Sequence, residues 1–271
     1  MGRRAQRRTV LHVEGDRAVP RQDTLAVEEP LELRVDGEAL TVTMRTPGDD
    51  MDLAAGFLVA EGAVKTASDI VTMRYCGGRD EDGLQTYNQL DLSLSVPAPA
   101  PRAFATTSAC GVCGTDSIGA VRQASPYTPS GGPVPREVLV SLPAALSAAQ
   151  QEFRKTGGLH AAGLFALDGT LLCLREDVGR HNAVDKVVGW ALREGRLPLS
   201  DTVLLVSGRA SFELVQKAWM AGIPVLAAIS APSSLAVELA EEAGMTLVGF
   251  LRGDTMNVYC GAERVYSQPP K

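Results

Sequence analysis

Residues 202–251, TVLLVSGRASFELVQKAWMAGIPVLAAISAPSSLAVELAEEAGMTLVGFL, decide the fold of this chain. Short runs that are apolar throughout alternate with longer stretches in which apolar residues recur at helical spacing. In chain order, these strands and helices are predicted at 203–207, 211–221, 223–229, 234–243 and 246–251. Strands of this kind are typical of a parallel sheet that helices cover on both faces. This part of the sequence therefore predicts an α/β/α sandwich.

The same alternation continues on both sides of that stretch. Asp168-Gly169 predicts the turn of a hairpin, because this dipeptide tolerates the backbone angles of a tight turn. In chain order, the further elements are a helix over 137–155, the hairpin strands 161–167 and 170–175, a helix over 183–194 and an edge strand at 257–260. We therefore expect the α/β/α unit to begin near residue 131 and to extend to the end of the chain.

The residues before position 130 have a β pattern instead. Asp36-Gly37 predicts a second hairpin, and Asp49 and Asp50 predict the start of a helix that Gly62 closes. The elements expected here are strands at 31–35, 38–45, 70–76 and 90–96 and a helix over 51–61. Two proline-rich stretches then mark the connection to the second unit. We expect a smaller β-rich domain over 1–130 and the α/β/α domain over 131–271.

Composition excludes several classes of protein. The chain has 26 Lys and Arg against 32 Asp and Glu, a net charge of −6, which argues against general nucleic-acid binding. Its apolar runs are too short to cross a membrane, and its basic N-terminus lacks the apolar run of a signal peptide. Five cysteines do not suggest a disulfide framework, so we expect a reduced, cytoplasmic protein.

Two strand-to-helix turns of the second unit carry small hydroxyl residues. Ser207-Gly208-Arg209 follows one predicted strand, and Ser230 begins the turn after the next strand. Both turns are expected at the carboxyl ends of parallel strands, where helix N-termini favour an anion. Ordinary capping of the helices by serine would explain either turn alone. Arg209 has no capping role and favours an anion site.

A third polar cluster, REDVGRHNAVDK, occupies residues 175–186. Asn182 and Asp185 have the spacing of a capping box, which leaves Arg180, His181 and Lys186 as cationic groups suited to a polyphosphate. Arg252-Gly253 adds a basic residue after the last parallel strand. These positions predict a site for a nucleotide-like molecule, although the chain has neither a P-loop nor a GxGxxG motif that would identify it.

Cys110-Gly111-Val112-Cys113 has three possible interpretations: half of a zinc site, a redox pair, or a sulfur-carrying thiol on a mobile segment. The motif alone does not separate them. His160-Ala161-Ala162 is placed like the His-x-Glu of zinc deaminases, but alanine replaces the glutamate and no Pro-Cys-x-x-Cys follows. Deaminase chemistry is therefore excluded, and we expect His160 to be satisfied by local hydrogen bonds.

Several long stretches resemble the FdhD-type formate dehydrogenase accessory sulfurtransferases. They are EEPLELRVDGEALTVTMRTPGDDMDLAAGFLVAEG, CGVCG, TGGLHAAGLF, REDVGRHNAVDKVVGWAL and SGRASFELVQKAWMAGIPVLAAISAPSSLAVELAEEAGMTLVGFLRG, which together cover most of the chain from residue 28 onward. The resemblance implies that the larger domain has a cytidine-deaminase-like fold. It also implies a cytoplasmic, dimeric protein that receives sulfur from a cysteine desulfurase and assists maturation of a formate dehydrogenase.

The resemblance further assigns roles to individual residues. Cys110 is expected to carry the persulfide, and Cys113 is expected to be auxiliary. The sulfur is expected to reach the molybdenum bis(molybdopterin guanine dinucleotide) cofactor, for which GDP is an analogue. The contacts implied for this cofactor near the last strand are Phe250, Leu251, Arg252, Gly253, Asp254 and Thr255, and Ser207, Arg209, Ser230, Arg180, His181 and Lys186 are expected to receive its anionic groups. A cofactor-insertion chaperone that moves no sulfur is the alternative.

Overall fold

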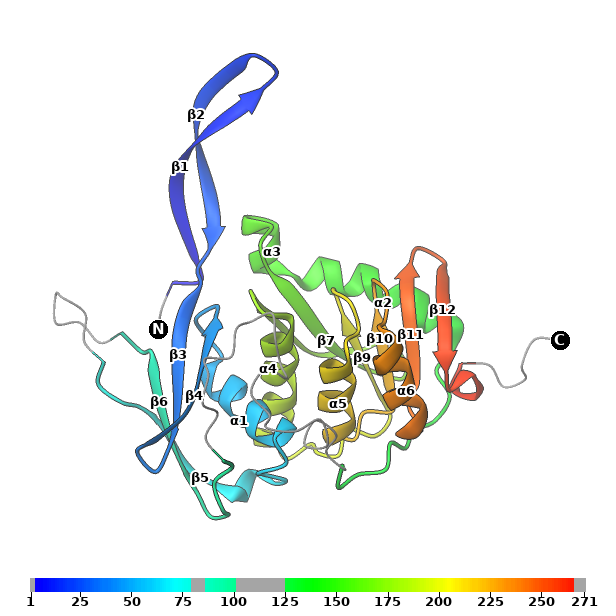
Figure 1. Ribbon diagram of the computed structural model, residues 1–271. Coiled ribbons are helices and arrows are strands. Elements are labelled where there is room, and N and C mark those ends of the chain that lie inside the picture. The colour runs from blue at the N-terminus through cyan, green and yellow to red at the C-terminus, as the bar shows by residue number, and fades with distance from the viewer. Residues whose placement is uncertain (1–2, 79–85, 101–124, 266–271) are drawn as a thin grey trace.

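The computed structural model describes residues 3–78, 86–100 and 125–265 (Figure 1). Its strands are β1 (Ala5–Glu14), β2 (Arg17–Ala26), β3 (Glu29–Val35), β4 (Glu38–Arg45), β5 (Ile70–Tyr75), β6 (Gln89–Leu94), β7 (His160–Ala166), β8 (Leu171–Asp177), β9 (Thr202–Val206), β10 (Val225–Ala228), β11 (Thr246–Arg252) and β12 (Thr255–Cys260). Its helices are α1 (Asp50–Ala60), η1 (Ala67–Asp69), α2 (Arg136–Ala149), α3 (Gln151–Thr156), α4 (Arg180–Arg193), α5 (Phe212–Met220), α6 (Ser234–Glu242) and η3 (Ala262–Arg264). In these ranges no helix is both long and apolar enough to cross a membrane.

The larger sheet has six strands in the order β12-β11-β10-β9-β7-β8. β9, β10 and β11 are parallel, as predicted from residues 202–251. β7 runs antiparallel to both β9 and β8, and β12 runs antiparallel to β11. The parallel strands therefore form the centre of the sheet, and their carboxyl ends meet at one edge.

Helices cover both faces of this sheet. Leu204 and Val206 of β9 belong to an apolar core that includes residues of α4, α5 and α6, whereas Val203 and Leu205 pack on the opposite side with Leu139 of α2. This alternation is the consequence of successive side chains on a strand pointing to opposite faces. Figure 1 shows α4, α5 and α6 in one layer and α2 in the other. The predicted α/β/α sandwich is confirmed.

The smaller sheet, β4-β3-β6-β5, belongs to the N-terminal part of the chain. The predicted hairpin is confirmed: β3 and β4 are antiparallel, and Asp36 and Gly37 have φ angles of 50° and 86° in the turn. Apolar residues of this sheet, of α1 and of α4 form one continuous core with the helical face of the larger sheet. The division of the chain at residue 130 stays a prediction, because a common core joins the two units.

The predicted helix over 137–155 is wrong, because two helices, α2 and α3, occupy it. Gln150 separates them with extended backbone angles. The Glu176 carboxylate accepts hydrogen bonds from the amides of Glu152 and Phe153, at 2.9 and 2.7 Å. A side chain on β8 therefore caps α3, and a contact so distant in sequence leaves no trace in the helical periodicity.

The predicted start of α4 is also wrong. The helix begins at Arg180, so Asn182 lies inside it and the expected capping box with Asp185 does not form. The Asn182 amide donates to the carbonyl of Met44 at 2.7 Å, and Asp185 accepts from Lys217 Nζ at 2.6 Å. Both side chains are therefore used for contacts between elements instead of capping.

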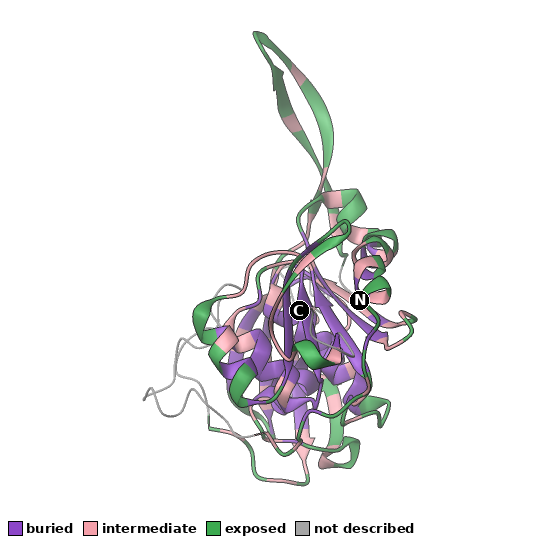
Figure 2. Ribbon diagram, turned by 90° about the vertical axis from the view of Figure 1, so that its right-hand side faces the viewer, coloured by how far each residue is buried: buried purple, intermediate pink, exposed green. Residues whose placement is uncertain are grey.

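No sequence pattern had predicted β1 and β2, which pair over ten residues each and project from the body as an antiparallel ribbon (Figure 1). Most of their side chains are exposed (Figure 2). Because the ribbon has no core face within the described part of the chain, the hydrophobic alternation that marked the other strands is weak here.

α1 and α4 cross at unusually close range. A Cβ added at Gly56 of α1 would collide with the carbonyl oxygen of Asp185, and one added at Gly189 of α4 would collide with the carbonyl oxygen of Asp52. Backbone atoms cannot move aside as a flexible side chain can. The two glycines are therefore required for the packing of the N-terminal unit on the larger domain.

We expect Gly189→Ala to lower the free energy of unfolding by about 3 kcal/mol or more, because overpacking against backbone forces the helices apart. Urea denaturation followed by circular dichroism measures this. Gly77→Ala is the matched control, since a Cβ there meets no atom within 4 Å. Equal stability of the two variants would contradict the close crossing of the helices.

Candidate functional site

The candidate site lies where the parallel strands end. β9 ends at Val206 and β10 ends at Ala228. Because β7 is antiparallel to β9, its first residue, His160, comes to the same edge, and so does Asp177, the last residue of β8. We call this edge, with the residues that follow each strand there, the carboxyl edge. Ligand crevices of α/β sheets usually form at such an edge.

Ser207 connects the sheet to a cavity at the carboxyl edge. Its Oγ accepts a hydrogen bond from the amide of Ala161 at 2.9 Å, which leaves the hydroxyl proton free for another acceptor. Ser207, His160 and Ile229 line a cavity of about 460 Å³, and Phe153 of α3 also lines it. The predicted residue Ser207 is therefore placed where it can donate to a bound molecule.

Two cationic or potentially cationic side chains lie close to Gly208 in the turn after β9. A Cβ at this position would lie 3.5 Å from His160 Nδ1 and 3.8 Å from Arg180 Cδ. Burial lowers the pKa of His160 below its usual range, and the charge of Arg180 lowers it further. His160 is thus neutral at pH 7. Since it lines the cavity, we include it in the candidate site.

Arg180 and His181 lie at the first turn of α4, at the same edge. The N-cap residue, Gly179, has no side chain to accept from the amides of that turn. Arg180 Nε and His181 Nδ1 are buried and have no hydrogen-bond partner in the described part of the chain, and His181 is only 5% exposed. A buried polar atom without a partner costs about 1–3 kcal/mol. Together with the positive end of α4, these two atoms favour an anionic ligand.

The other nitrogen of His181 contacts α5. Nε2 lies 3.3 Å from Ser211 Oγ and 3.7 Å from a carboxylate oxygen of Glu213. The hydrogen-bond interaction with His181 is the main reason that the pKa of Glu213 is lowered to about 2. The imidazole is thus held at one nitrogen, and Nδ1 is left for a further partner.

Lys186 does not contribute to the carboxyl edge in the way predicted. Its side chain is 1% exposed, and Nζ lies 2.7 Å from an oxygen of the fully buried Asp177. Nζ also donates to the carbonyl of Thr46 at 2.9 Å. Because these partners already use the ammonium group in the interior, Lys186 fixes α4 to the N-terminal unit and has no surface from which to contact a phosphate.

The two serine turns differ in what their serines do. α6 is capped in the ordinary way, because Ser233 Oγ accepts from the amide of Ala236 at 3.3 Å. At α5 the N-cap residue, Ser211, makes no such bond, and its hydroxyl faces His181 instead. Capping therefore explains the second turn. Ser230, which begins that turn, is half-buried, and Arg209 in the first turn is exposed.

The last residues of β11 form the other end of the carboxyl edge. Phe250 has a left-handed φ of 52° and is 40% exposed, whereas Leu251 is fully buried in the core. Arg252 is exposed, and its Nε donates to the carbonyl of Ile229 at 2.9 Å. Phe250 and Arg252 are therefore available to a ligand, and the side chain of Leu251 is not.

The three residues that follow form an exposed turn into β12. Gly253 has a φ of 55°. The carbonyl of Asp254 accepts from Arg136 at 2.6 Å, and the hydroxyl of Thr255 donates to the carbonyl of Arg252 at 3.1 Å. These contacts fix the shape of the turn and leave the Asp254 side chain exposed.

The carboxyl edge therefore has two ends. Arg180 packs against the turn after β9, and His181 lies beside Ser211 at the end of that turn, so both are two strand spacings, or about 10 Å, from β11. Ser207 lies at the same end, after β9, and Ser230 lies between the two ends, after β10. The structure therefore brings Ser207, Arg180 and His181 together and places Phe250 and Arg252 a short distance along the same edge.

Cys110 and Cys113 lie outside the described residues. Among the cysteines inside them, Cys173 is buried, which raises the pKa of its thiol to about 12, and burial also raises the pKa of Cys260. Neither is therefore a thiolate at neutral pH. No group of three His, Cys, Asp or Glu is arranged for a metal within 3–78, 86–100 and 125–265.

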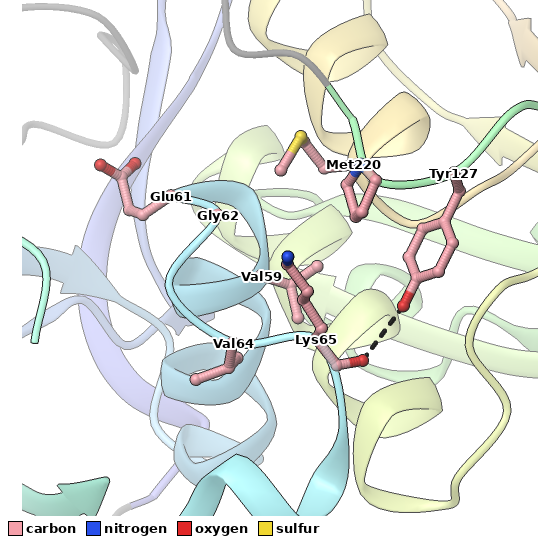
Figure 3. Close-up of a pocket in the computed structure, with 8 residues that line it drawn as sticks. Val59, Glu61, Gly62, Val64, Lys65, Tyr127 and Met220 are labelled. Carbon is pink, nitrogen blue, oxygen red and sulfur yellow. Dashed lines mark hydrogen bonds between the residues drawn. The ribbon is translucent and has the colours of Figure 1, made fainter. Parts of the chain in front are cut away.

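Figure 3 shows a second cavity, of about 320 Å³, beside the C-terminal end of α1. The hydroxyl of Tyr127 points to the carbonyl of Lys65 and donates to it at 3.1 Å (Figure 3). Ser125 donates to the carbonyl of Trp219, near the C-terminal end of α5, so this cavity lies away from the carboxyl edge. Because its described lining contains none of the predicted site residues, we place the candidate site at the carboxyl edge.

Three contributors to the site were not predicted. His160 was expected to be locally satisfied, and neither Glu213 nor Phe153 was singled out. Glu213 reaches His181 only because α4 and α5 pack side by side on one face of the sheet. Phe153 lines the cavity because α3 is a separate helix. Neither contact has a spacing in the sequence that would have indicated it.

Comparison with known proteins agrees with the family resemblance of the sequence. A family model described as the FdhD/NarQ family matches residues 26–266. The sulfur carrier protein FdhD of Nocardia farcinica is 60% identical over 269 residues, covering 98% of this chain and 96% of the relative. The protein of the same name from Mycolicibacterium paratuberculosis is 58% identical over 266 residues, covering 96% and 98%.

A solved structure has the same fold. The crystal structure of a putative formate dehydrogenase accessory protein from Desulfotalea psychrophila matches with a TM-score of 0.80 and covers 97% of this chain and 100% of that chain. The two sequences are 23% identical. The likeness therefore supports the α/β architecture and its order of elements.

We expect Glu213→Gln to lower stability at pH 7, because the folded chain holds this carboxylate ionised beside His181. A pKa lowered from 4.5 to about 2 stabilises the fold above pH 4.5, and this contribution is lost as the pH falls towards 2. Urea unfolding at pH 7, 5, 4 and 3 should show the difference from wild type shrinking. Glu238→Gln, on the exposed face of α6, is the control, and a difference that persists at pH 3 would contradict the interaction.

Proposed function

Because the chain belongs to the FdhD/NarQ family, we propose that it is a sulfur carrier that assists maturation of a formate dehydrogenase. The observation that carries this proposal is the full-length similarity, at 60% and 58% identity, to relatives named sulfur carrier protein FdhD. We propose that it acts in the cytoplasm as a homodimer, with a cysteine desulfurase and the formate dehydrogenase as protein partners.

Cys110 is the proposed carrier of sulfur. Its thiolate attacks the outer sulfur of a persulfide on the desulfurase; a new S–S bond forms while the S–S bond of the donor breaks. The desulfurase leaves as a thiolate, and no electrons are gained or lost overall. Cys113 then resolves the persulfide by attacking Cys110 Sγ, so that a disulfide forms and hydrosulfide leaves. The raised pKa values of Cys173 and Cys260 support this choice, because neither is a nucleophile at neutral pH.

The proposed substrate for this sulfur is molybdenum bis(molybdopterin guanine dinucleotide), bound along the carboxyl edge. Arg180 Nε, His181 Nδ1 and the amides at the start of α4 provide donors for one diphosphate group. Arg252 and the exposed ring of Phe250 provide a cation and a stacking surface about 10 Å away. Two such groups fit a nucleotide of this cargo better than a single phosphate.

The number of residues on each side of Cys110 sets how far its thiol can lie from the described parts of the chain. Cys110 is ten residues from Ala100 and fifteen from Ser125, so the backbone spans at most about 33 Å from the first and 50 Å from the second. Strands of four to seven residues make the larger sheet only about 25 Å high or less. The maximum length of these connections is therefore comparable to or greater than the height of the larger sheet.

We expect Cys110→Ala to abolish sulfur loading, because no other cysteine has its place in the CGVC motif. After incubation with a cysteine desulfurase and cysteine, intact-protein mass spectrometry should find one added sulfur on wild type and none on the variant. Cys260→Ala is the matched control and should load normally. Loading of Cys110→Ala would contradict the route, and wild type that binds GDP without loading would establish the insertion chaperone instead.

We expect GDP to bind the carboxyl edge and Arg180→Ala or Arg252→Ala to weaken it at least about tenfold, since each removes a charge-assisted hydrogen bond to phosphate. Isothermal titration calorimetry of the full chain measures this. Arg74→Ala, an exposed arginine of the smaller sheet, is the control and should bind like wild type. Absence of GDP binding, or equal affinity of all variants, would exclude the proposed cargo site.

A further inference from the structure

The two ring nitrogens of His181 have different surroundings. Nε2 contacts α5, where it lies 3.3 Å from Ser211 Oγ and 3.7 Å from a carboxylate oxygen of Glu213. Nδ1 is buried and has no hydrogen-bond partner in the described part of the chain. Because His181 stands in the first turn of α4, at the carboxyl edge, Nδ1 is the nitrogen that is left for a ligand.

The carboxylate of Glu213 decides which nitrogen carries the hydrogen of a neutral ring. This group is ionised at neutral pH, because its pKa is lowered to about 2. An ionised carboxylate only accepts hydrogen bonds, so it favours the tautomer in which Nε2 carries the hydrogen. Nδ1 then presents a lone pair, which cannot bond to an ionised phosphate oxygen. An anion at Nδ1 therefore requires a second hydrogen on the ring, which makes it an imidazolium.

The other carboxylates near the ring are already paired with lysines. Asp185, one turn farther along α4, accepts from Lys217 Nζ of α5 at 2.6 Å. Asp177 at the end of β8 lies 2.7 Å from Lys186 Nζ. In the part of the chain that the structure describes, the carboxylate of Glu213 forms no ion pair except with the imidazole. Glu213 is therefore the carboxylate that acts on the ring.

Two basic groups also lie near the ring. Arg180 precedes His181 on α4, and its buried Nε has no hydrogen-bond partner in the described ranges. His160 comes from β7, close enough for the charges of Arg180 and His181 to lower its pKa. Like charges disfavour each other, so a charged imidazole beside Arg180 is costly unless an anion balances both. The carboxylate favours the proton on the ring, and the arginine opposes it until an anion binds.

We infer that His181 takes up a proton when a phosphate group binds at the start of α4, and that Glu213 is the positioning residue that directs this proton to Nδ1. The inference rests on the proposed cargo site and adds a proton to its requirements. Arginine keeps its charge throughout the neutral range, whereas an imidazole changes charge between about pH 5 and 8. The site therefore holds its cargo more tightly at lower pH and releases it more readily as the pH rises.

Proton uptake on binding is measured by titration calorimetry of the full chain with GDP. At about pH 7.5, repetition in PIPES, HEPES and Tris gives the number of protons from the dependence of the observed enthalpy on the ionisation enthalpy of the buffer. Wild type is expected to take up roughly half a proton or more, and His181→Gln almost none. No uptake by wild type, or equal uptake by His181→Gln, would overturn the inference.

Nuclear magnetic resonance of the wild-type chain gives the same information without a substitution in the buried ring. The chain has three histidines, so long-range ¹H–¹⁵N spectra can follow each imidazole. In an imidazolium the two ring nitrogens have similar shifts, whereas in a neutral ring the shifts are well separated. GDP should convert one ring to the imidazolium, and spectra of His12→Gln and His160→Gln assign the other two. Conversion of His160, or of no histidine, would overturn the inference.

The pH dependence of GDP binding distinguishes the positioning role of Glu213 from a structural one. The Kd of wild type should rise at least about threefold from pH 7 to pH 8.5, as the linked proton becomes scarce. Glu213→Gln should bind more weakly at pH 7, and its Kd should begin to rise about one pH unit lower, because no carboxylate favours the imidazolium. Glu238→Gln, on the exposed face of α6, is the matched control and should follow wild type. A Glu213→Gln variant that is weakened by the same factor at every pH would overturn the assignment.

These outcomes also separate the inference from the proposed function. GDP binding without proton uptake would overturn the inference alone and leave the cargo site in place. Absence of GDP binding would exclude the cargo site and the inference together. Sulfur loading of Cys110 tests the carrier role independently of both.

Discussion

The close crossing of α1 and α4 is the contact on which the rest of the molecule depends. Gly56 and Gly189 let each helix backbone approach the other where a Cβ would collide with it. The aspartates at this crossing are also paired: Asp52 lies 2.8 Å from Arg175, and Asp185 accepts from Lys217. Packing and charge therefore fix the same two helices. Because α4 begins at the carboxyl edge, the crossing also determines where Arg180 and His181 lie.

A buried ion pair also fixes the position of α4, whose N-terminus lies at the candidate site. Lys186 and Asp177 are both almost fully buried, and they join the start of α4 to Thr46 of the N-terminal unit. Such a pair contributes little net stability relative to well-packed apolar residues, but removal of one partner is strongly destabilising. Its effect is to allow one arrangement of the two units. The consequence for function is that the N-terminal unit, although it supplies no described residue of the carboxyl edge, holds the helix whose N-terminus forms part of it.

The larger domain could be predicted from the sequence because its elements follow local rules. Apolar runs at 203–207, 223–229 and 246–251 became β9, β10 and β11, and the serines and arginines after them came to one edge because parallel strands end together. The errors arose where a distant residue replaced a local one. Glu176 caps α3, so one predicted helix is two, and Asn182 bonds Met44 instead of capping α4.

The sequence alone determined the α/β/α sandwich, the order of its strands along the chain and the chemical character of the carboxyl edge, because periodicity and turn chemistry act over a few residues. Only the tertiary structure decided which cations remain available there. Lys186 is neutralised by Asp177 in the interior, whereas Arg180 Nε and His181 Nδ1 keep no partner among the described residues. It also decided that β1 and β2 project as a ribbon. Partner choice and exposure depend on how elements pack across the molecule, and a linear pattern does not contain that information.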